Sequence, residues 1–254
     1  MSASYVVTGG GRGIGRAVAE RLAERAAVVV IERDAEALAW TEGHPRLVAV
    51  AGDAADETVT ERAADRAEAA APLAGWVNNA AALGDAAPFH SAPAADVLER
   101  VSLNLGLALV GCATAVRRFL AAGTAGAIVN VSSHQAVRAV PGCASYVTAK
   151  AGIEGLTRAL AVEYGPGGIR VNAVAPGSIA TERYAEFLNV QDTADAARTE
   201  DAMAALHPLG RVGRTDEVAA AIAYLLSSDA GFITGATVPV DGGRTVLARD
   251  PEAL

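Results

Sequence analysis

The chain has 254 residues, of which 52% are hydrophobic and 20% charged, enough to bury a large core within one domain. Its 21 basic and 29 acidic residues give a net charge of −8 without any basic block. This balance argues against a nucleic-acid-binding or polybasic membrane-binding surface and favours small molecules and copies of the chain itself as partners.

The sequence also argues against membrane insertion and secretion. The long uncharged stretches 101–116 and 119–137 are interrupted by Gly, Asn and Ser, so neither predicts a membrane-spanning helix. A strand pattern begins near Ser4 and leaves no room for a signal segment. With Cys112 and Cys143 as its only cysteines, we expect a cytoplasmic protein with two free thiols.

Strand and helix patterns alternate from one end of the chain to the other. Seven short runs rich in Val and Ile predict strands at Tyr5–Val7, Val28–Ile31, Leu47–Val50, Gly75–Val77, Ala127–Val131, Ile169–Val174 and Thr237–Val240. The segments between them predict crossover helices at Gly13–Ala26, Glu57–Ala71, Ala94–Leu120, Ser145–Tyr164 and Thr215–Ser227. Together they predict a single α/β domain over residues 1–254, a doubly wound Rossmann fold whose mostly seven-stranded parallel sheet is flanked by helices. Ligands are then expected beyond the carboxyl ends of the strands.

Residues 178–214 form the longest stretch without a strand or helix pattern. A segment of this length in a compact domain is usually functional or mobile. We therefore predict that it is a lid over a substrate.

A glycine-rich turn follows the first predicted strand, with the sequence Thr8-Gly9-Gly10-Gly11-Arg12-Gly13-Ile14-Gly15. Glycines allow a sharp turn and close approach to a pyrophosphate, and the start of the next helix directs N–H groups toward that anion. The turn lacks a Gly-Lys-Ser/Thr ending, which disfavours a nucleotide-hydrolysing P-loop. A dinucleotide is the expected ligand.

Glu32 ends the second predicted strand, seventeen residues after Gly15. A carboxylate there can accept hydrogen bonds from the adenosine ribose hydroxyls, which favours NAD over NADP. Arg33 could pair with a 2′-phosphate, so NADP stays possible, and both residues could instead belong to a solvated turn. Asp53 is expected either to contact the adenine or to cap the following helix.

Tyr146 and Lys150 are four residues apart on a predicted helix and therefore share one face. Lys150 is the only lysine in the chain. A neighbouring ammonium would lower the pKa of a phenol and make Tyr146 a usable acid and base. Ser133, thirteen residues before Tyr146, ends the fifth strand and could orient a substrate oxygen. Each residue alone could be an ordinary packing, surface or capping residue, but their combination on a dinucleotide fold favours chemistry.

These motifs make the chain resemble the classical short-chain dehydrogenases/reductases over essentially its whole length. The resemblance rests on the glycine-rich turn, Gly52-Asp53, Asn78-Asn79-Ala80-Ala81, Asn104, Ser133, Tyr146, Lys150, Pro176-Gly177-Ser178-Ile179-Ala180-Thr181 and Val240-Asp241-Gly242-Gly243. Two positions depart from the family pattern. Ala81 replaces a glycine and adds a methyl group near the expected cofactor ribose, and Glu32 replaces the Asp typical of NAD-preferring members.

The resemblance implies an NAD(P)(H)-dependent enzyme that interconverts a secondary alcohol and a ketone. Tyr146 would exchange the hydroxyl proton, Ser133 would hold the substrate oxygen, Lys150 would hydrogen-bond the nicotinamide ribose, and Asn104 would position a proton-relaying water. Cofactor contacts are expected from Gly9, Gly11, Arg12, Gly13, Ile14, Gly15, Glu32, Arg33, Asp53, Ala54, Asn79, Ala80, Ala81, Tyr146, Lys150, Pro176, Gly177, Ile179 and Thr181. The resemblance also implies a homotetramer. We expect no metal site.

The substrate is less constrained by the sequence. Ser133, His134, Gln135, Tyr146 and Tyr184 are the expected substrate contacts, and with Arg183 they suggest a polar substrate such as a polyol, sugar or hydroxy acid. A ketoreductase acting on acyl-carrier-protein substrates is an alternative, for which the chain offers only the small pairs Arg117-Arg118 and Arg211/Arg214. A methyltransferase would not need Tyr146 and Lys150. A dinucleotide-binding sensor would not need Asn104, Ser133, Tyr146 and Lys150, which match the catalytic tetrad of the family that the chain resembles.

Overall fold

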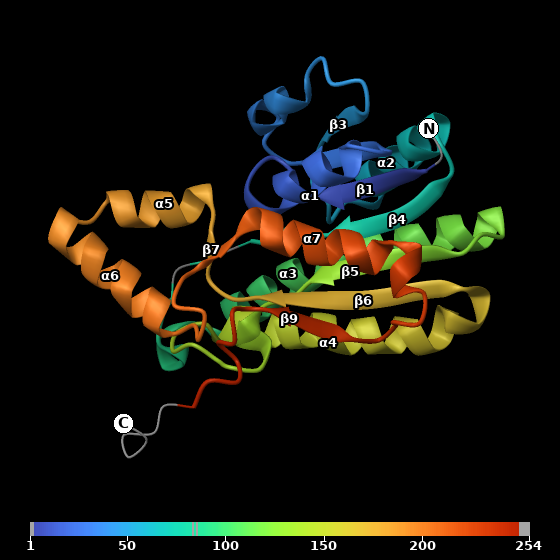
Figure 1. The fold of residues 1–254 in the computed structure, drawn as a ribbon. Coiled ribbons are helices and arrows are strands. Elements are labelled where there is room, and N and C mark those ends of the chain that lie inside the picture. The colour runs from blue at the N-terminus through green and yellow to red at the C-terminus, as the bar shows by residue number, and fades with distance from the viewer. Residues whose placement is uncertain (1–2, 83, 85, 249–254) are drawn as a thin grey trace.

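The computed structural model describes residues 3–82, 84 and 86–248. Its centre is a seven-stranded parallel sheet with the strand order β3-β2-β1-β4-β5-β6-β9 (Figure 1). The strands are β1 (Ser4–Thr8), β2 (Ala27–Glu32), β3 (Leu47–Ala51), β4 (Leu73–Asn78), β5 (Gly126–Val131), β6 (Ile169–Pro176) and β9 (Thr237–Val240). All seven predicted strands are confirmed, and the doubly wound fold with them.

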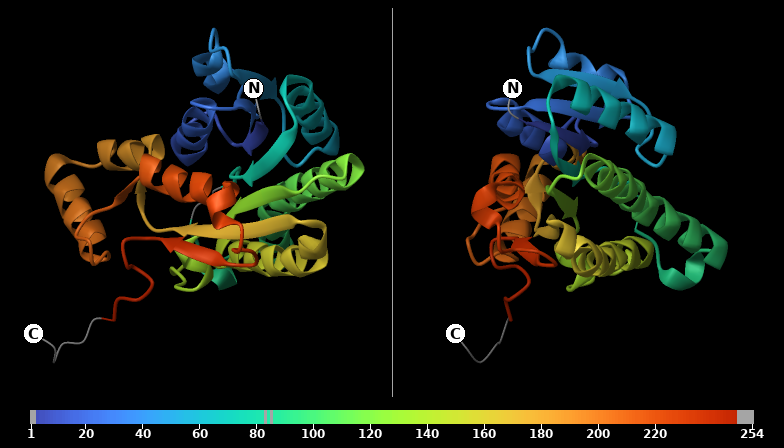
Figure 2. Two further views of the ribbon diagram at one scale, coloured as in Figure 1. Left: turned by 45° about the vertical axis from the view of Figure 1, so that its right-hand side comes forward. Right: turned by 90° about the vertical axis from the view of Figure 1, so that its right-hand side faces the viewer.

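Helices cover both faces of this sheet, as two further views show (Figure 2). One face packs against α1 (Gly13–Ala23) and α7 (Thr215–Leu226), and the other against α2 (Glu57–Ala70), α3 (Ala94–Ala122) and α4 (Ala144–Tyr164). Val28, Val29 and Val30 in β2 are fully buried, although their side chains point alternately to the two faces. Burial on both sides explains why the strands read as continuous apolar runs.

The direction in which successive strands are added to the sheet reverses between β1 and β4. The chain runs from β1 to β2 on one side and from β4 to β5 on the other, and folds of this kind bind ligands in the crevice at this switch point. The glycine-rich turn after β1 and the segment after β4 both lie at this switch point. The topology therefore places the predicted dinucleotide motif where a ligand site is expected.

Residues 178–214 contain regular structure that the sequence did not predict. The segment holds β7 (Ile179–Ala180), α5 (Glu182–Asn189), α6 (Thr193–Ala205) and β8 (Gly213–Arg214), and β7 pairs with β8 in parallel. The two helices project from the body of the domain (Figure 1). Neither contains a fully buried residue. Tyr184, Phe187 and Leu188 do share one face of α5, but this helix has only eight residues, too few for a long periodic pattern.

Helix α3 is long and apolar enough to cross a membrane by length and composition, with a mean hydropathy of 1.5 in its most apolar window. In the structure this helix packs against α2, α4 and β4. Its apolar residues include Leu107, Ala115 and Phe119, which are buried in the core. Packing therefore accounts for much of its hydropathy. Cys112, on this helix, and Cys143 are free, as expected.

Candidate active site

The glycine-rich turn is tied to the end of β4 by side-chain hydrogen bonds. The backbone N–H groups of Asn79 and Ala80 donate to Thr8 Oγ1, each at 3.0 Å, and Asn79 Nδ2 donates to the carbonyl oxygen of Gly9 at 2.8 Å. Gly9 has a φ of +65°, and a Cβ there would lie 2.7 Å from the Ala80 Cα. A Cβ at Gly15 would overlap the Gly9 carbonyl. These glycines are therefore required by backbone conformation and close packing.

The N-terminus of α1 is open to an anion. Arg12, the N-cap residue, makes no side-chain cap, and the first turn contains no acidic residue. The N–H of Gly13 instead donates to Glu182 Oε2 at 2.9 Å, across 169 positions of the sequence. A carboxylate thus already binds at the helix end where a pyrophosphate is expected, which shows that this end suits a negative group.

A groove of about 300 Å³ extends from this turn along the ends of the strands. It is lined by Gly9, Arg12, Ile31, Glu32, Arg33, Gly52, Asp53, Ala54, Asn79, Ala80, Ala81, Ala82, Leu103 and Leu107. Glu32 Oε2 accepts from the N–H of Gly11 at 3.2 Å, and its Oε1 accepts from the N–H of Arg33 at 2.8 Å. These bonds hold the carboxylate at the groove wall. The open helix end, the glycine cradle and the carboxylate together fit a dinucleotide.

Asp53 lines the groove but does not cap α2. Its Oδ1 accepts from the N–H of Ala55 at 2.9 Å, whereas Asp56 accepts from the N–H of Thr58 at 2.8 Å and is the N-cap residue. The expectation that Asp53 could be the helix cap is wrong. The carboxylate three residues closer to the helix is the one that can reach its free N–H groups.

A second, larger cleft of about 850 Å³ adjoins the first, and Ala82 and Leu103 line both. Its wall contains Asn104, Ser133, His134, Gln135, Tyr146 and Tyr184, which the sequence named, together with Gly177, Ile179 and Thr181. Lys150 lies behind the wall, with its Nζ 5.5 Å from the centroid of the Tyr146 ring. The structure thus brings the four tetrad residues to one place beside the glycine-rich groove.

Burial sets the protonation of this pair. Burial lowers the pKa of Lys150 to about 8, and its Nζ donates to the Val131 carbonyl at 2.7 Å. Burial raises the pKa of Tyr146, against the lowering effects of a hydrogen bond with Ser133 and the positive charge of Arg183. The expectation of a lowered pKa for Tyr146 is wrong for this structure. The ammonium lies against the ring, and desolvation outweighs the charges around the phenol.

Asn104 is held by the loop that follows β4. Its Oδ1 accepts from the N–H of Ala82 at 3.0 Å, and its Nδ2 donates to the Ala82 carbonyl at 2.9 Å and to the Arg100 carbonyl at 3.1 Å. The side chain therefore fastens this loop to α3. Both polar atoms of the Asn104 amide are hydrogen-bonded to backbone groups. These are the atoms that were expected to position a proton-relaying water.

His134 and Gln135 face inward. The Nδ1 of His134 donates to the Pro176 carbonyl at 3.1 Å, and burial, followed by the charge of Arg244, lowers the His134 pKa to about 4. The imidazole is therefore neutral near pH 7. Within the described part of the chain, His134 Nε2 and Gln135 Oε1 are buried without a hydrogen-bond partner. The carbonyl of Pro176 thus accepts the hydrogen bond that orients the His134 ring.

Several lining residues were not predicted as site residues from the sequence. Arg100, Leu103, Cys143, Phe187 and Met203 also line the larger cleft. Arg100 lies four residues before Asn104 and Cys143 three before Tyr146, so helical spacing could have placed each beside a tetrad residue. Met203 carries no such signal, because α6 reaches the cleft only through the tertiary fold.

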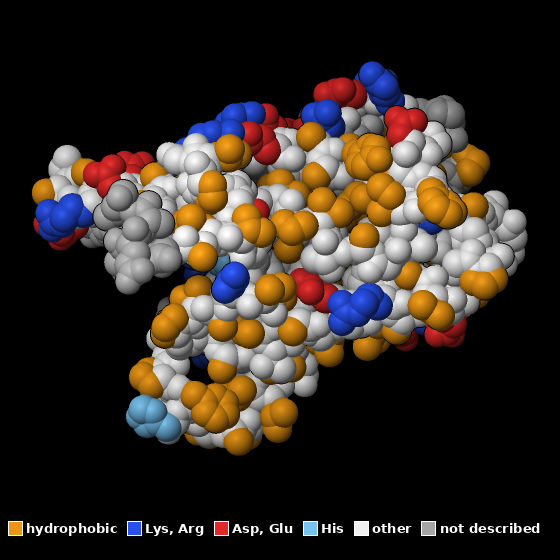
Figure 3. Space-filling model, turned by 60° about the horizontal axis from the view of Figure 1, so that its bottom comes forward, with side chains coloured by type: hydrophobic (Ala, Val, Ile, Leu, Met, Phe, Trp, Pro, Cys, Tyr) orange, Lys and Arg blue, Asp and Glu red, His pale blue; other side chains and the backbone are white. Residues whose placement is uncertain are grey.

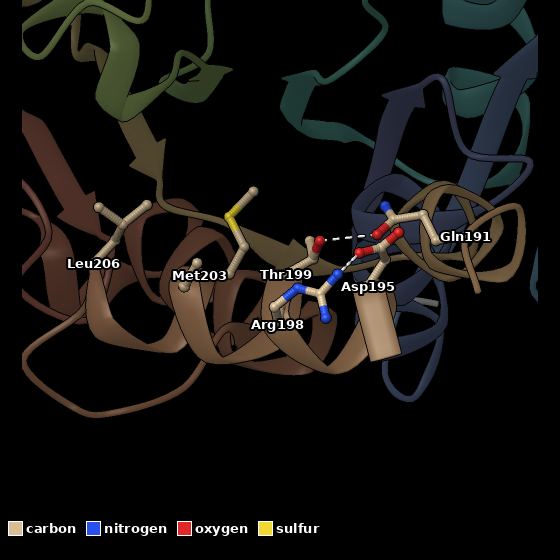
Figure 4. Close-up of a pocket in the computed structure, with 7 residues that line it drawn as sticks. Gln191, Asp195, Arg198, Thr199, Met203 and Leu206 are labelled. Atoms are coloured by element: carbon tan, nitrogen blue, oxygen red, sulfur yellow. Dashed lines mark hydrogen bonds and ion pairs between the residues drawn. The ribbon is translucent and has the colours of Figure 1, made fainter. Parts of the chain in front are cut away.

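Another concavity lies along α6 and the turn before it (Figure 4). Thr199 Oγ1 donates to Gln191 Oε1 at 2.8 Å, and Arg198 pairs with Asp195. The polar groups shown there pair with each other across the helix surface. None of the tetrad residues lines this concavity.

Comparisons with known proteins agree with this geometry. A family model described as enoyl-(acyl carrier protein) reductase matches residues 9–245. Cis-4-hydroxycyclohexanecarboxylate dehydrogenase of Sinomonas cyclohexanicum is 43% identical over 249 residues, which cover 95% of this chain and 96% of that protein. Cyclohexanol dehydrogenase of an Acinetobacter species is 35% identical, with 94% of each chain covered. The crystal structure of levodione reductase has a TM-score of 0.85 and 33% identity and covers 97% of this chain and 98% of that one.

Proposed function

The chain belongs to the classical short-chain dehydrogenases/reductases, enzymes that oxidise alcohols or reduce carbonyl groups with nicotinamide dinucleotides. We propose that it is an NAD-dependent dehydrogenase of cyclic secondary alcohols. The proposal rests mainly on one observation: Ser133, Tyr146 and Lys150 lie together next to the groove that begins at the glycine-rich turn. Two of the similar enzymes are named for alcohols on a cyclohexane ring, which supports a ring as the substrate skeleton.

The site residues divide the work of alcohol oxidation. A bound nicotinamide dinucleotide supplies hydride transfer. Ser133 hydrogen-bonds the substrate hydroxyl, and Tyr146 takes the hydroxyl proton, or returns it in the reverse direction. Burial raises the pKa of Tyr146 in this structure, so the ionised phenol needs stabilisation by nearby positive charge. The ammonium of Lys150, which lies beside the Tyr146 ring, is one source of that charge.

The proposed preference for NAD rests on Glu32. Its carboxylate lies on the groove wall, bonded to the N–H of Gly11, where it can accept from ribose hydroxyls and repels a 2′-phosphate. We expect kcat/KM for NAD⁺ to exceed that for NADP⁺ by at least about tenfold, the size of one lost charge-assisted contact. Steady-state rates with both cofactors and one accepted alcohol check this, and a preference for NADP⁺ would reverse the assignment.

Residues 178–214 supply the proposed lid. Ser178, Ile179, Thr181, Tyr184, Phe187 and Met203 of this segment line the larger cleft. Closure of these residues over a substrate would exclude water from the reacting groups. Gly177, Ile179 and Thr181, at the base of the segment, are then in position to approach a bound nicotinamide.

The variant Tyr146→Phe tests the chemistry. It keeps the ring that packs beside Lys150 and removes the hydroxyl that moves the proton. We expect kcat for oxidation of a cyclohexanol substrate, followed by NADH absorbance, to fall at least about 100-fold, the lower range for general acid–base catalysis. The dissociation constant for NADH should change little. Turnover near the wild-type rate would show that Tyr146 is not the acid and base.

The acyl-carrier-protein alternative has less support. An acidic carrier requires available basic groups, but Arg118 pairs with Glu61, Asp65 and Glu68, and Arg117 with Glu57 and Glu61. Arg211 and Arg214 likewise pair with Asp216 and Glu217. These arginines are already neutralised locally. A cofactor-binding sensor is disfavoured because it needs no serine, tyrosine and lysine around a substrate-sized cleft.

We also propose a homotetramer in the reducing cytoplasm. Large apolar side chains are exposed on α3 and α4, including Leu98, Leu109 and Leu120 on α3 and Val162 on α4. Exposed apolar helix faces of this kind favour packing against copies of the chain. The two free thiols are compatible with a reducing compartment.

A further inference from the structure

The described side chains that line the larger cleft include basic groups but no acidic ones. Among its described lining residues there is no Asp or Glu, but there are two arginines, Arg100 on α3 and Arg183 on α5. Neither guanidinium has a hydrogen bond or ion pair with another residue in the described part of the chain. The protein has a net charge of −8, so two arginines at one cleft without a partner among the described residues give this site a local positive character.

Some arginines elsewhere on the surface are paired with carboxylates. Arg118, Arg198, Arg211 and Arg214 all have acidic partners, three of them within six residues of the arginine. Arg183 also has an acidic neighbour, Glu182, but that carboxylate is turned to the N–H of Gly13. The guanidinium of Arg183 is thus left facing the cleft although a carboxylate is adjacent in sequence.

The position of Arg183 relative to the tetrad is informative. It lies in the first turn of α5, beside Tyr184, and both line the cleft. Its charge acts on the phenol of Tyr146 and lowers the pKa of that group, so the guanidinium is within electrostatic reach of the reacting hydroxyl. Arg183 does not line the dinucleotide groove, whereas Arg12 does. The charge of Arg183 is therefore directed at the substrate space.

Apolar side chains also line the cleft. Leu103, Ile179, Phe187 and Met203 are among them. Such walls suit a hydrocarbon skeleton, and a guanidinium at one end suits a carboxylate held by two parallel N–H bonds. The cleft therefore combines the reacting residues, apolar side chains and a guanidinium group.

We propose that Arg183 binds a carboxylate on the substrate, so that this enzyme acts on cyclic hydroxy acids. The alcohol carbon lies at Ser133 and Tyr146, the ring lies against the apolar walls, and the carboxylate meets the lid. This inference rests on the proposed function and specifies its substrate class. Arg183 is a specificity-determining residue in this arrangement, since it contacts the substrate away from the reacting atoms.

The test compares 4-hydroxycyclohexanecarboxylate with its methyl ester, which keeps the ring and the hydroxyl and lacks the charge. Wild-type enzyme, R183Q, R183K and R198Q are assayed with NAD⁺ for kcat/KM on both compounds. Arg198 serves as the control because it lies on the neighbouring helix, outside the cleft, and is paired with Asp195. R100Q is assayed alongside to separate the two guanidinium groups.

We expect the wild-type enzyme to prefer the acid to the ester. R183Q should lower kcat/KM for the acid about 10- to 100-fold, as for loss of a charge-assisted contact, and change that for the ester by less than about threefold. R183K should retain part of the preference, because it keeps the charge but loses the planar fork. R198Q should match the wild type.

Three outcomes would overturn the inference. The first is equal kcat/KM of the wild type for acid and ester. The second is an equal loss on both compounds in R183Q. The third is loss of the acid preference in R100Q but not in R183Q, which would assign the carboxylate to Arg100. In each case oxidation of the ester still supports the alcohol dehydrogenase assignment. If neither compound, nor cyclohexanol, is oxidised with NAD⁺ or NADP⁺, the proposed function itself fails.

Discussion

Tyr146 and Lys150 are both more easily neutral in this structure than in water. Desolvation lowers the pKa of the lysine to about 8 and raises that of the tyrosine. Spacing on a helix correctly indicated that the two groups are neighbours, because Nζ lies near the Tyr146 ring. It did not indicate burial, which depends on the elements packed around them. The direction of the tyrosine shift was therefore decided by tertiary packing.

His134 gives the protein an acid-sensitive stability. Its pKa is lowered from 6.5 to about 4, mainly by burial, so below pH 6.5 the unfolded chain takes up a proton that the folded chain resists. Stability is thus lost as the pH falls from 6.5 toward 4. Between pH 7 and pH 5 this residue should cost about 2 kcal/mol in the free energy of unfolding.

The variant His134→Asn isolates this effect, because asparagine keeps an N–H donor for the Pro176 carbonyl and does not titrate. Urea unfolding of both proteins at pH 7 and pH 5 measures it. Between pH 7 and pH 5, the free energy of unfolding should fall by about 2 kcal/mol less in the variant than in the wild type. Equal losses would show that His134 is protonated in the folded protein.

At the scale of elements, we expect α5 to compete with a bound dinucleotide for the end of α1. Glu182 accepts the hydrogen bond from Gly13 that we propose for a pyrophosphate oxygen. Binding of the dinucleotide there would displace this carboxylate from the start of α1. The contact couples the glycine-rich turn to the segment that carries Arg183 and Tyr184.

Glu182→Gln should consequently bind NADH more tightly. The amide is a weaker acceptor than the carboxylate and does not repel the phosphates, so we expect a lower dissociation constant by about three- to tenfold, as for a modest loss of competing charge. Fluorescence titration measures the constant. Glu186→Gln is the matched control, since Glu186 lies on the same helix and, among the described residues, only Glu182 of that helix accepts a hydrogen bond from the turn. Weaker binding by the Glu182 variant would contradict the competition.

At the scale of the whole molecule, apolar surface remains after the chain has folded. The face turned forward in Figure 3 shows many hydrophobic side chains, with charged groups along its upper edge and a few among the hydrophobic ones near its middle. Val162 on α4 is 81% exposed and Leu120 on α3 is 54% exposed. Such side chains are costly in water unless another subunit covers them.

Val162→Glu should therefore weaken the proposed tetramer. A charge buried in an apolar interface is strongly unfavourable, whereas on an exposed helix of the monomer it changes stability little. Sedimentation velocity at low micromolar concentration should show a smaller species than the wild type, with an unchanged circular dichroism spectrum. A wild-type protein that sediments as a monomer would rule out the assembly.

The sequence by itself determined the seven strands, the five main helices and the positions of the glycine-rich turn and the tetrad. These features depend on local periodicity and on short spacings, such as the four residues between Tyr146 and Lys150. The tertiary structure decided the helices α5 and α6, which lack a buried face, and the bond between Gly13 and Glu182. It also decided the pKa shifts and the presence of Arg100 and Arg183 together at the larger cleft. Burial, and contacts between residues far apart in the chain, exist only once the chain has folded.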